Sequence, residues 1–69
     1  MTIGQRLKQV LNDQGMLQKE LAEKIGVSEI VISRYVHGGR IVSVPILIEI
    51  CKALNVSADY LLGLTEVNA

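Results

Sequence analysis

The feature that most constrains the fold is the spacing of helix-starting and helix-ending residues along a chain of 69 residues. Hydroxyl side chains, which cap helix N-termini, stand before most of the apolar segments, and glycine or asparagine, which ends helices, follows them. This pattern predicts five short helices. Their boundary residues, in chain order, are Thr2/Gly15, Leu17/Gly26, Ser28/Gly38, Ser43/Asn55 and Ser57/Gly63.

Apolar residues recur at helical spacing within these segments, as amphipathic helices require. Only 3% of the residues are aromatic, so the core must be built from aliphatic side chains. We therefore expect a compact all-α, five-helix domain that spans residues 1–69 as one unit. The predicted buried stripes of the first, second and fourth helices are Ile3, Leu7, Val10 and Leu11; Leu17, Leu21, Ala22 and Ile25; and Leu47, Ile50, Cys51 and Leu54.

The stretch SEIVISRY, residues 28–35, contains three consecutive β-branched residues and could be read as a strand. As a helix it gathers Ile32, Tyr35 and Val36 on one side, whereas strand alternation separates polar from apolar residues less well. We interpret it as a helix capped by Ser28. This interpretation leaves Ile30 on the polar side of the helix.

Several classes of protein are not predicted. One cysteine and one histidine provide neither an intrachain disulfide nor a zinc site, and Cys51 is expected in the core. No run of apolar residues is long enough to span a membrane, and no signal peptide is evident, so we expect a cytoplasmic protein. No nucleophile, base and orienting group stand at workable spacing, so we expect neither an enzyme nor a cofactor.

The charges sum to zero but are unevenly distributed. Residues 1–40 carry six basic and four acidic residues, a net charge of +2, whereas residues 41–69 carry one basic and three acidic residues, a net charge of −2. A more basic N-terminal half fits contact with an anionic partner.

Two short helices joined by a glycine-containing turn, at about residues 17–37, form the helix-turn-helix arrangement. The residues GMLQKELAEKIGVSEIVISRYVHGG resemble the family of Cro and CI phage repressors and their bacterial relatives, and NVSADYLLG resembles that family's fifth helix. The resemblance covers nearly the whole chain. It implies a lambda repressor-like domain that binds double-stranded operator DNA as a homodimer, with the third helix in the major groove. A repressor is the expected kind of regulator, although the residues themselves do not encode the sign of regulation.

The resemblance also implies roles for individual residues. Arg34 can pair with guanine, Glu29 can accept from cytosine, and Ile30 can contact a thymine methyl group. Two of these have alternative interpretations, since Glu29 also suits the helix dipole and Ile30 could belong to a protein-binding patch. The expected base-reading residues are Glu29, Ile30, Ser33 and Arg34, and the expected DNA-backbone contacts are Gln18, Lys19, His37 and Arg40.

The chain departs from the family pattern at three places. Leu11 and Val36 replace an Arg–Glu pair found in many relatives, and we interpret the double change as a substitution within the core. Leu17 replaces the usual Ser or Thr cap, which predicts a helix start weaker by roughly 1 kcal/mol if nothing compensates. The proline usually found before Ser43 is absent, and Pro45 follows instead.

The rival function is a protein-interaction module of the antitoxin or anti-repressor type that uses the same fold to hold a protein. A regulatory protein partner is also compatible with the DNA-binding interpretation. For the homodimer we expect contacts from the fifth helix and the residues that follow it, namely Tyr60, Leu61 and Leu64.

Overall fold

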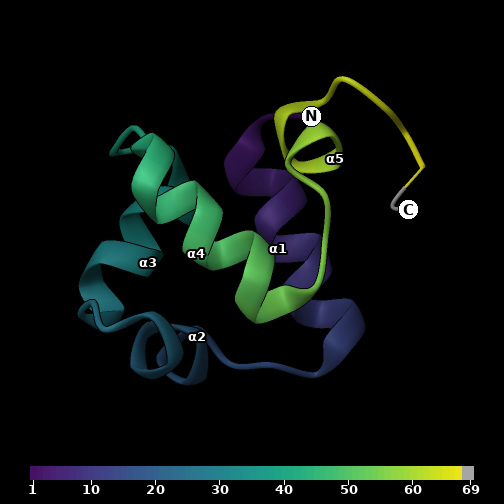
Figure 1. Cartoon of the computed structure of the whole chain (residues 1–69). Coiled ribbons are helices and arrows are strands. Elements are labelled where there is room, and N and C mark those ends of the chain that lie inside the picture. The colour runs from purple at the N-terminus through teal and green to yellow at the C-terminus, as the bar shows by residue number, and fades with distance from the viewer. Residues whose placement is uncertain (68–69) are drawn as a thin grey trace.

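The helices begin and end where the capping residues predict. The computed structural model describes residues 1–67, and within them it contains five α-helices and no strand (Figure 1). The expected domain boundary at residue 69 lies outside the described residues. The all-α, five-helix prediction is confirmed by α1 (Ile3–Gln14), α2 (Gln18–Ile25), α3 (Glu29–His37), α4 (Val44–Leu54) and α5 (Ala58–Leu62).

Side-chain hydrogen bonds fix four of the helix starts. The Thr2 hydroxyl accepts from the Gln5 N–H at 3.1 Å, and the Gln5 side chain accepts from the Thr2 N–H at 2.8 Å, which completes a capping box. Serine hydroxyls cap the starts of α3, α4 and α5 at Ser28, Ser43 and Ser57. Pro45 lies in the first turn of α4, where its missing N–H has no helical partner to lose.

The start of α2 is built differently. Leu17 makes no side-chain cap, but the Glu20 carboxylate accepts from the Leu17 N–H at 3.0 Å. This bond satisfies one backbone donor and so offsets part of the weakness that the sequence predicts there. The Leu17 side chain is exposed, which corrects its assignment to the buried stripe of α2. It lies just before the helix begins, so it does not follow the helical face that buries Leu21.

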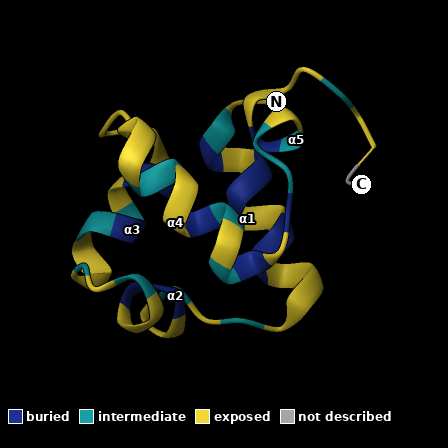
Figure 2. Cartoon of the chain, viewed as in Figure 1, coloured by how far each residue is buried: buried dark blue, intermediate teal, exposed yellow. Residues whose placement is uncertain are grey.

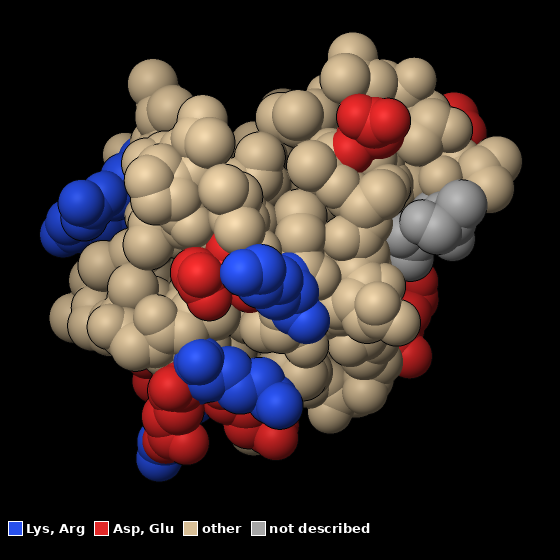
Figure 3. Space-filling model, viewed as in Figure 1, with Lys and Arg blue, Asp and Glu red and all other residues tan. Residues whose placement is uncertain are grey.

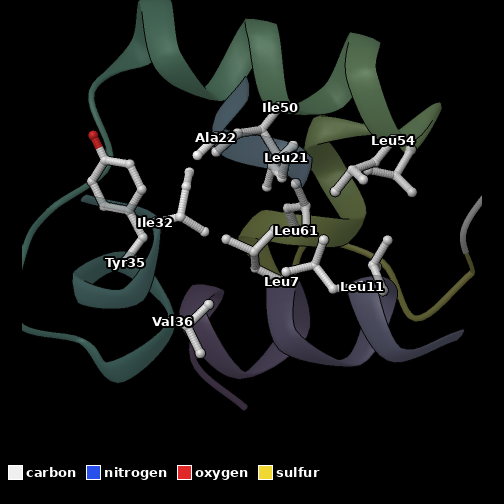
Figure 4. Close-up of a cluster of buried hydrophobic side chains, with 12 residues drawn as sticks. Leu7, Leu11, Leu21, Ala22, Ile32, Tyr35, Val36, Ile50, Leu54 and Leu61 are labelled. Atoms are coloured by element: carbon white, nitrogen blue, oxygen red, sulfur yellow. The ribbon is translucent and has the colours of Figure 1, made fainter. Parts of the chain in front are cut away.

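One aliphatic core lies between the helices. α3 packs against α1 and α2, α4 packs against α2, and α5 packs against α1 and α4. Buried positions follow the inner faces of these helices, and their side chains converge in one space (Figures 2 and 4). Leu11 and Val36 are both buried in this cluster, as predicted for the pair that replaces two charges. The most deeply buried side chains are Leu7, Leu21, Ile32, Ile50, Leu54 and Leu61.

Leu47 and Cys51 lie at the margin of the core. Both are only half-buried, although the sequence assigns them to the buried stripe of α4. Burial of the Cys51 thiol raises its pKa, which disfavours the reactive thiolate form. Both side chains pack against the core from its edge.

Arg6 is a buried cation that the sequence does not predict. Its residue is 5% exposed, and its Nη2 donates to Glu66 Oε1 at 2.7 Å. The guanidinium also lies over the Tyr60 ring, with 5.4 Å between its central carbon and the ring centroid, within cation–π range. The Arg6 hydrogen bond lowers the pKa of the Glu66 carboxyl. These contacts join α1 to α5 and to the segment that follows it.

Within residues 1–67, no helix has the length and apolar character needed to cross a membrane.

Candidate nucleic-acid interface

A tight turn connects α2 to α3. Gly26 adopts a φ of 76°, in the left-handed region that favours glycine, and its N–H donates to the Ala22 carbonyl at 2.9 Å. The Val27 N–H donates to the same carbonyl at 3.0 Å, and Ser28 then caps α3. Only three residues therefore separate the end of α2 from the start of α3. The result is a helix-turn-helix at the position that the sequence predicts.

The inner face of α3 fixes the helix to the rest of the domain. Ile32, Tyr35 and Val36 are buried, and Figure 4 shows Ile32 next to Ala22 of α2, with Tyr35 and Val36 at the same end of the core cluster. The helical interpretation of SEIVISRY is therefore confirmed. Because these three residues are anchored, the opposite side of α3 is presented to solvent in one orientation.

The outer face of α3 carries four of the predicted site residues. Glu29, Ile30 and Arg34 are exposed, and Ser33 is half-buried. Within residues 1–67 the side chains of Glu29, Ser33 and Arg34 make neither a hydrogen bond nor an ion pair. Their polar groups are consequently available to an external partner. Ile30, on the same outer face as these three polar residues, is 65% exposed.

The four predicted DNA-backbone residues lie at the start of α2, at the end of α3 and just beyond α3. Gln18 and Lys19 begin α2, whereas His37 ends α3 and Arg40 follows it. Lys19, His37 and Arg40 are exposed, and Gln18 is half-buried. In the view of Figure 3, basic side chains lie at the α3 side, basic and acidic side chains lie together over α2 and α4, and the part over α5 shows only acidic ones. The charge on this face is thus positive at the α3 side, mixed over α2 and α4, and negative over α5.

The predicted dimer contacts divide into two groups. Leu64 is exposed, and Tyr60 is half-buried beneath Arg6. Leu61 is only 1% exposed and packs into the core of its own protomer, so its side chain offers no surface to a second copy. The assignment of Leu61 to a dimer contact is therefore wrong. The reason is that α5 is so short that its inward position is needed to close the core.

No metal site is evident among residues 1–67. They contain no group of three His, Cys, Asp or Glu side chains that could hold a metal ion. A shallow hollow of about 310 Å³ lies between α2 and α4. It contains none of the predicted site residues, and its lining is Lys24, Ile25, Glu49, Lys52 and Ala53.

Sequence reasoning missed two residues that position the helices. The sequence gives no signal that Arg6 is buried, because an arginine in an amphipathic helix is usually solvated. Gly4 is buried between α1 and α3. A glycine inside a helix costs stability unless packing requires it, and that signal could have identified Gly4.

Known proteins are similar to this chain in sequence and in fold. The sequence profile of the helix-turn-helix family matches residues 7–61. The chain is 38% identical over 68 residues to the HTH-type transcriptional regulator ImmR of Bacillus subtilis (strain 168), an alignment that covers 99% of this chain and 54% of ImmR. The chain therefore spans about half the length of this curated relative.

Two solved structures have the same fold. The P22 c2 repressor in complex with synthetic operator 9T superposes with a TM-score of 0.84 and 29% identity, covering 90% of this chain and 94% of the repressor chain. A structure of the SinR–SinI complex matches with a TM-score of 0.82 and 35% identity, and the match covers 88% of this chain and 60% of the chain in that structure. SinR is a Bacillus subtilis protein. These relatives carry the names of regulators and repressors rather than of enzymes. Together with the profile match, they show that the chain belongs to the helix-turn-helix family of the Cro and CI type.

Proposed function

We propose that the protein is a sequence-specific DNA-binding transcriptional regulator, a repressor, that inserts α3 into the major groove of its operator. The observation that carries the proposal is the outer face of α3, where Glu29, Ser33 and Arg34 have no partner within residues 1–67. An α-helix fits the major groove of B-DNA, and unpaired polar side chains are what base edges require. The naming of ImmR as a transcriptional regulator and the operator-bound state of the P22 c2 repressor support it.

We assign base reading to the outer face of α3. Arg34 pairs with the O6 and N7 of guanine, and Glu29 accepts from the amino group of cytosine. Ser33 donates to or accepts from a neighbouring base. Ile30 contacts the methyl group of thymine, which is the apolar feature of the major groove that suits an exposed isoleucine.

We assign the DNA-backbone contacts to the residues that flank this face. Lys19 and Arg40 supply positive charge to phosphates on the two sides of the groove. Gln18 and His37 donate hydrogen bonds to the backbone. These contacts fix the register of α3 on the duplex and carry no sequence information themselves.

The remaining parts of the proposal concern assembly. Residues 1–69 form one DNA-binding domain, which acts in the cytoplasm by binding rather than by catalysis. Two copies associate through Tyr60 and Leu64, and their α3 helices occupy half-sites about 34 Å apart on a two-fold symmetric site. Sedimentation with and without duplex tests the dimer. A protein that stays monomeric at tens of micromolar in both conditions would refute the proposed association.

The experiment that tests the function is selection of bound duplexes from a randomised pool at about 0.15 M salt, where nonspecific ionic binding is weakened. The wild type is compared with Arg34→Ala and Ile30→Ala. We expect a two-fold symmetric motif that loses a G·C preference in the first variant and a T preference in the second. A folded wild-type chain that enriches no sequence would refute the proposal.

A second candidate function is binding of a regulatory protein. Three large apolar side chains, Ile41, Val44 and Ile48, are exposed around the start of α4, and Ile41 is 92% exposed. SinR, which shares the fold, is known in a complex with SinI. Arg34→Ala separates the candidates, because it should impair DNA binding and leave the affinity for a protein partner nearly unchanged.

A further inference from the structure

Gly4 lies in the first turn of α1, where this helix meets the last turn of α3. A Cβ atom added to Gly4 would lie 2.4 Å from the carbonyl oxygen of Tyr35 and 2.6 Å from that of Val36. Carbon and oxygen atoms that are not bonded do not approach so closely, and both oxygens belong to the backbone, so no rotamer change can relieve the contact. Any residue other than glycine would have to push α1 and α3 apart.

The electrostatics of the two helix ends favour the same contact. The last carbonyl groups of a helix carry partial negative charge, whereas the first turn of a helix carries partial positive charge. At Gly4 the positive end of α1 rests against the negative end of α3. Glycine is normally unfavourable inside a helix, so the close approach is the physical reason for its presence here.

The two ends of α3 are therefore held by different elements. Its N-terminal end is fixed by the Gly26 turn and the Ser28 cap that follow α2. Its C-terminal end is fixed by α1 through Gly4. Arg34 and His37 project from this same last stretch of α3, adjacent in sequence to Tyr35 and Val36.

We infer, on the basis of the proposed function, that Gly4 is a positioning residue for DNA binding. It contacts no DNA itself. It sets how closely the C-terminal half of α3 approaches α1, and thereby where Arg34 and His37, and Arg40 beyond the helix, meet the duplex. The N-terminal half of α3, with Glu29 and Ile30, is positioned by α2 and depends on Gly4 less.

The test compares Gly4→Ala with Val56→Ala, a variant that removes core volume between α4 and α5. Both are titrated with the best duplex that the wild type enriches, at several salt concentrations and at a temperature where circular dichroism shows each to be fully folded. We expect Gly4→Ala to bind about tenfold more weakly or worse, with a salt dependence shallower by about one unit of slope for each phosphate that the variant no longer neutralises. Val56→Ala should keep the wild-type affinity and slope, because a purely structural loss does not move either in the folded protein.

Selection from the randomised pool gives a second, independent measurement. Gly4→Ala should lose the preference at the base read by Arg34 and keep the one read by Ile30. If Gly4→Ala is not folded, both experiments are repeated in an Asn55→Gly background, where glycine relieves the positive φ of 54° at the end of α4.

The outcomes separate the two proposals. If Gly4→Ala binds DNA with the affinity, salt dependence and base preference of the wild type, the positioning role is overturned and the proposed function stays intact. A variant that stays unfolded even with Asn55→Gly would make Gly4 a structural residue and also overturn the inference. A wild type that enriches no duplex would refute the proposed function first, and the positioning role with it.

Discussion

Ile30 and Ile32 stand two residues apart on α3, yet Ile30 is 65% exposed and Ile32 is 0% exposed. Two arginines differ in the same way. Arg34 is exposed with no ion pair among residues 1–67, whereas Arg6 is buried against Glu66 and Tyr60. The pairs show that residue type does not determine role in this domain. What determines it is whether the side chain faces a packing partner or solvent, and the unusual cases, an exposed isoleucine and a buried arginine, are the informative ones.

The largest effect should come from the isoleucines. Ile32→Ala is expected to lower the free energy of unfolding by about 2–5 kcal/mol, because it leaves a cavity in the core. Ile30→Ala should change it by no more than about 0.5 kcal/mol, as for other surface substitutions. Urea denaturation of the two variants measures both values. Equal losses would mean that the two faces of α3 are not as distinct as their exposure indicates.

The arginines should separate binding from stability. Arg34→Ala is expected to cost about 1–3 kcal/mol of sequence-specific DNA binding while the unfolding midpoint stays near that of the wild type. Arg6→Ala should do the reverse, because it leaves Glu66 and Tyr60 without their partner in the folded protein. Titration with the enriched operator and thermal unfolding measure the two properties. A loss of stability in Arg34→Ala would contradict the assignment of this residue to an external partner.

Two serines of the same segment sharpen the comparison further. Ser28→Ala should destabilise the domain by about 1 kcal/mol, because the Ser28 hydroxyl accepts from the Val31 N–H and caps α3. Ser33→Ala, on the outer face, should cost no more than about 0.5 kcal/mol. Urea denaturation measures the free energy of unfolding of both variants, with the same dependence on denaturant concentration assumed for each. Similar values would show that the cap bond contributes nothing measurable to stability.

The smallest effect should depend on pH. The Arg6 hydrogen bond lowers the pKa of Glu66 in the folded protein, so this pair stabilises the fold above the usual range of a glutamate pKa. That contribution is lost as the pH falls through the lowered pKa. Glu66→Gln should therefore be less stable than the wild type at neutral pH, and the difference should shrink on acidification.

Glu49→Gln is the matched control, since Glu49 is exposed and makes no hydrogen bond or ion pair in the described part of the chain. Its stability difference from the wild type should not follow the same acid transition. Thermal unfolding between pH 7 and the acid limit of reversible folding measures both variants. A difference for Glu66→Gln that persists unchanged into acid would exclude the ion pair as its cause.

Much of the fold could be predicted from the sequence because its signals are local. Capping hydroxyls and the residues with positive φ mark the ends of the helices within a few residues of where they act. The inner face of α3 followed from helical periodicity, and the exposure of Ile30 and Arg34 followed from the same pattern. The resemblance to the Cro and CI family rested on these segments as well.

The rest could not be predicted because its causes are distant in sequence. Arg6 is buried by Glu66, sixty residues away, and no local pattern pairs them. Gly4 meets backbone atoms of Tyr35 and Val36, which periodicity does not describe. The dimer contact predicted for Leu61 was wrong, because α5 is too short for its sequence to show which side chains face the core. The roles of the outer-face residues on DNA remain predictions, since they concern a partner outside the chain.

The pairing of Arg6 with Glu66 has a consequence for the order in which the chain is made. During translation α1 is synthesised well before residue 66. The nascent chain therefore contains Arg6 before its partner carboxylate exists. Until then its burial would leave a cation unpaired, which is costly. Of the five helices, α1 is therefore made first, yet its Arg6 gains a carboxylate partner only after α5 has been made. A chain stopped at Gly63 would contain the residues of all five helices and still lack the carboxylate that pairs with Arg6.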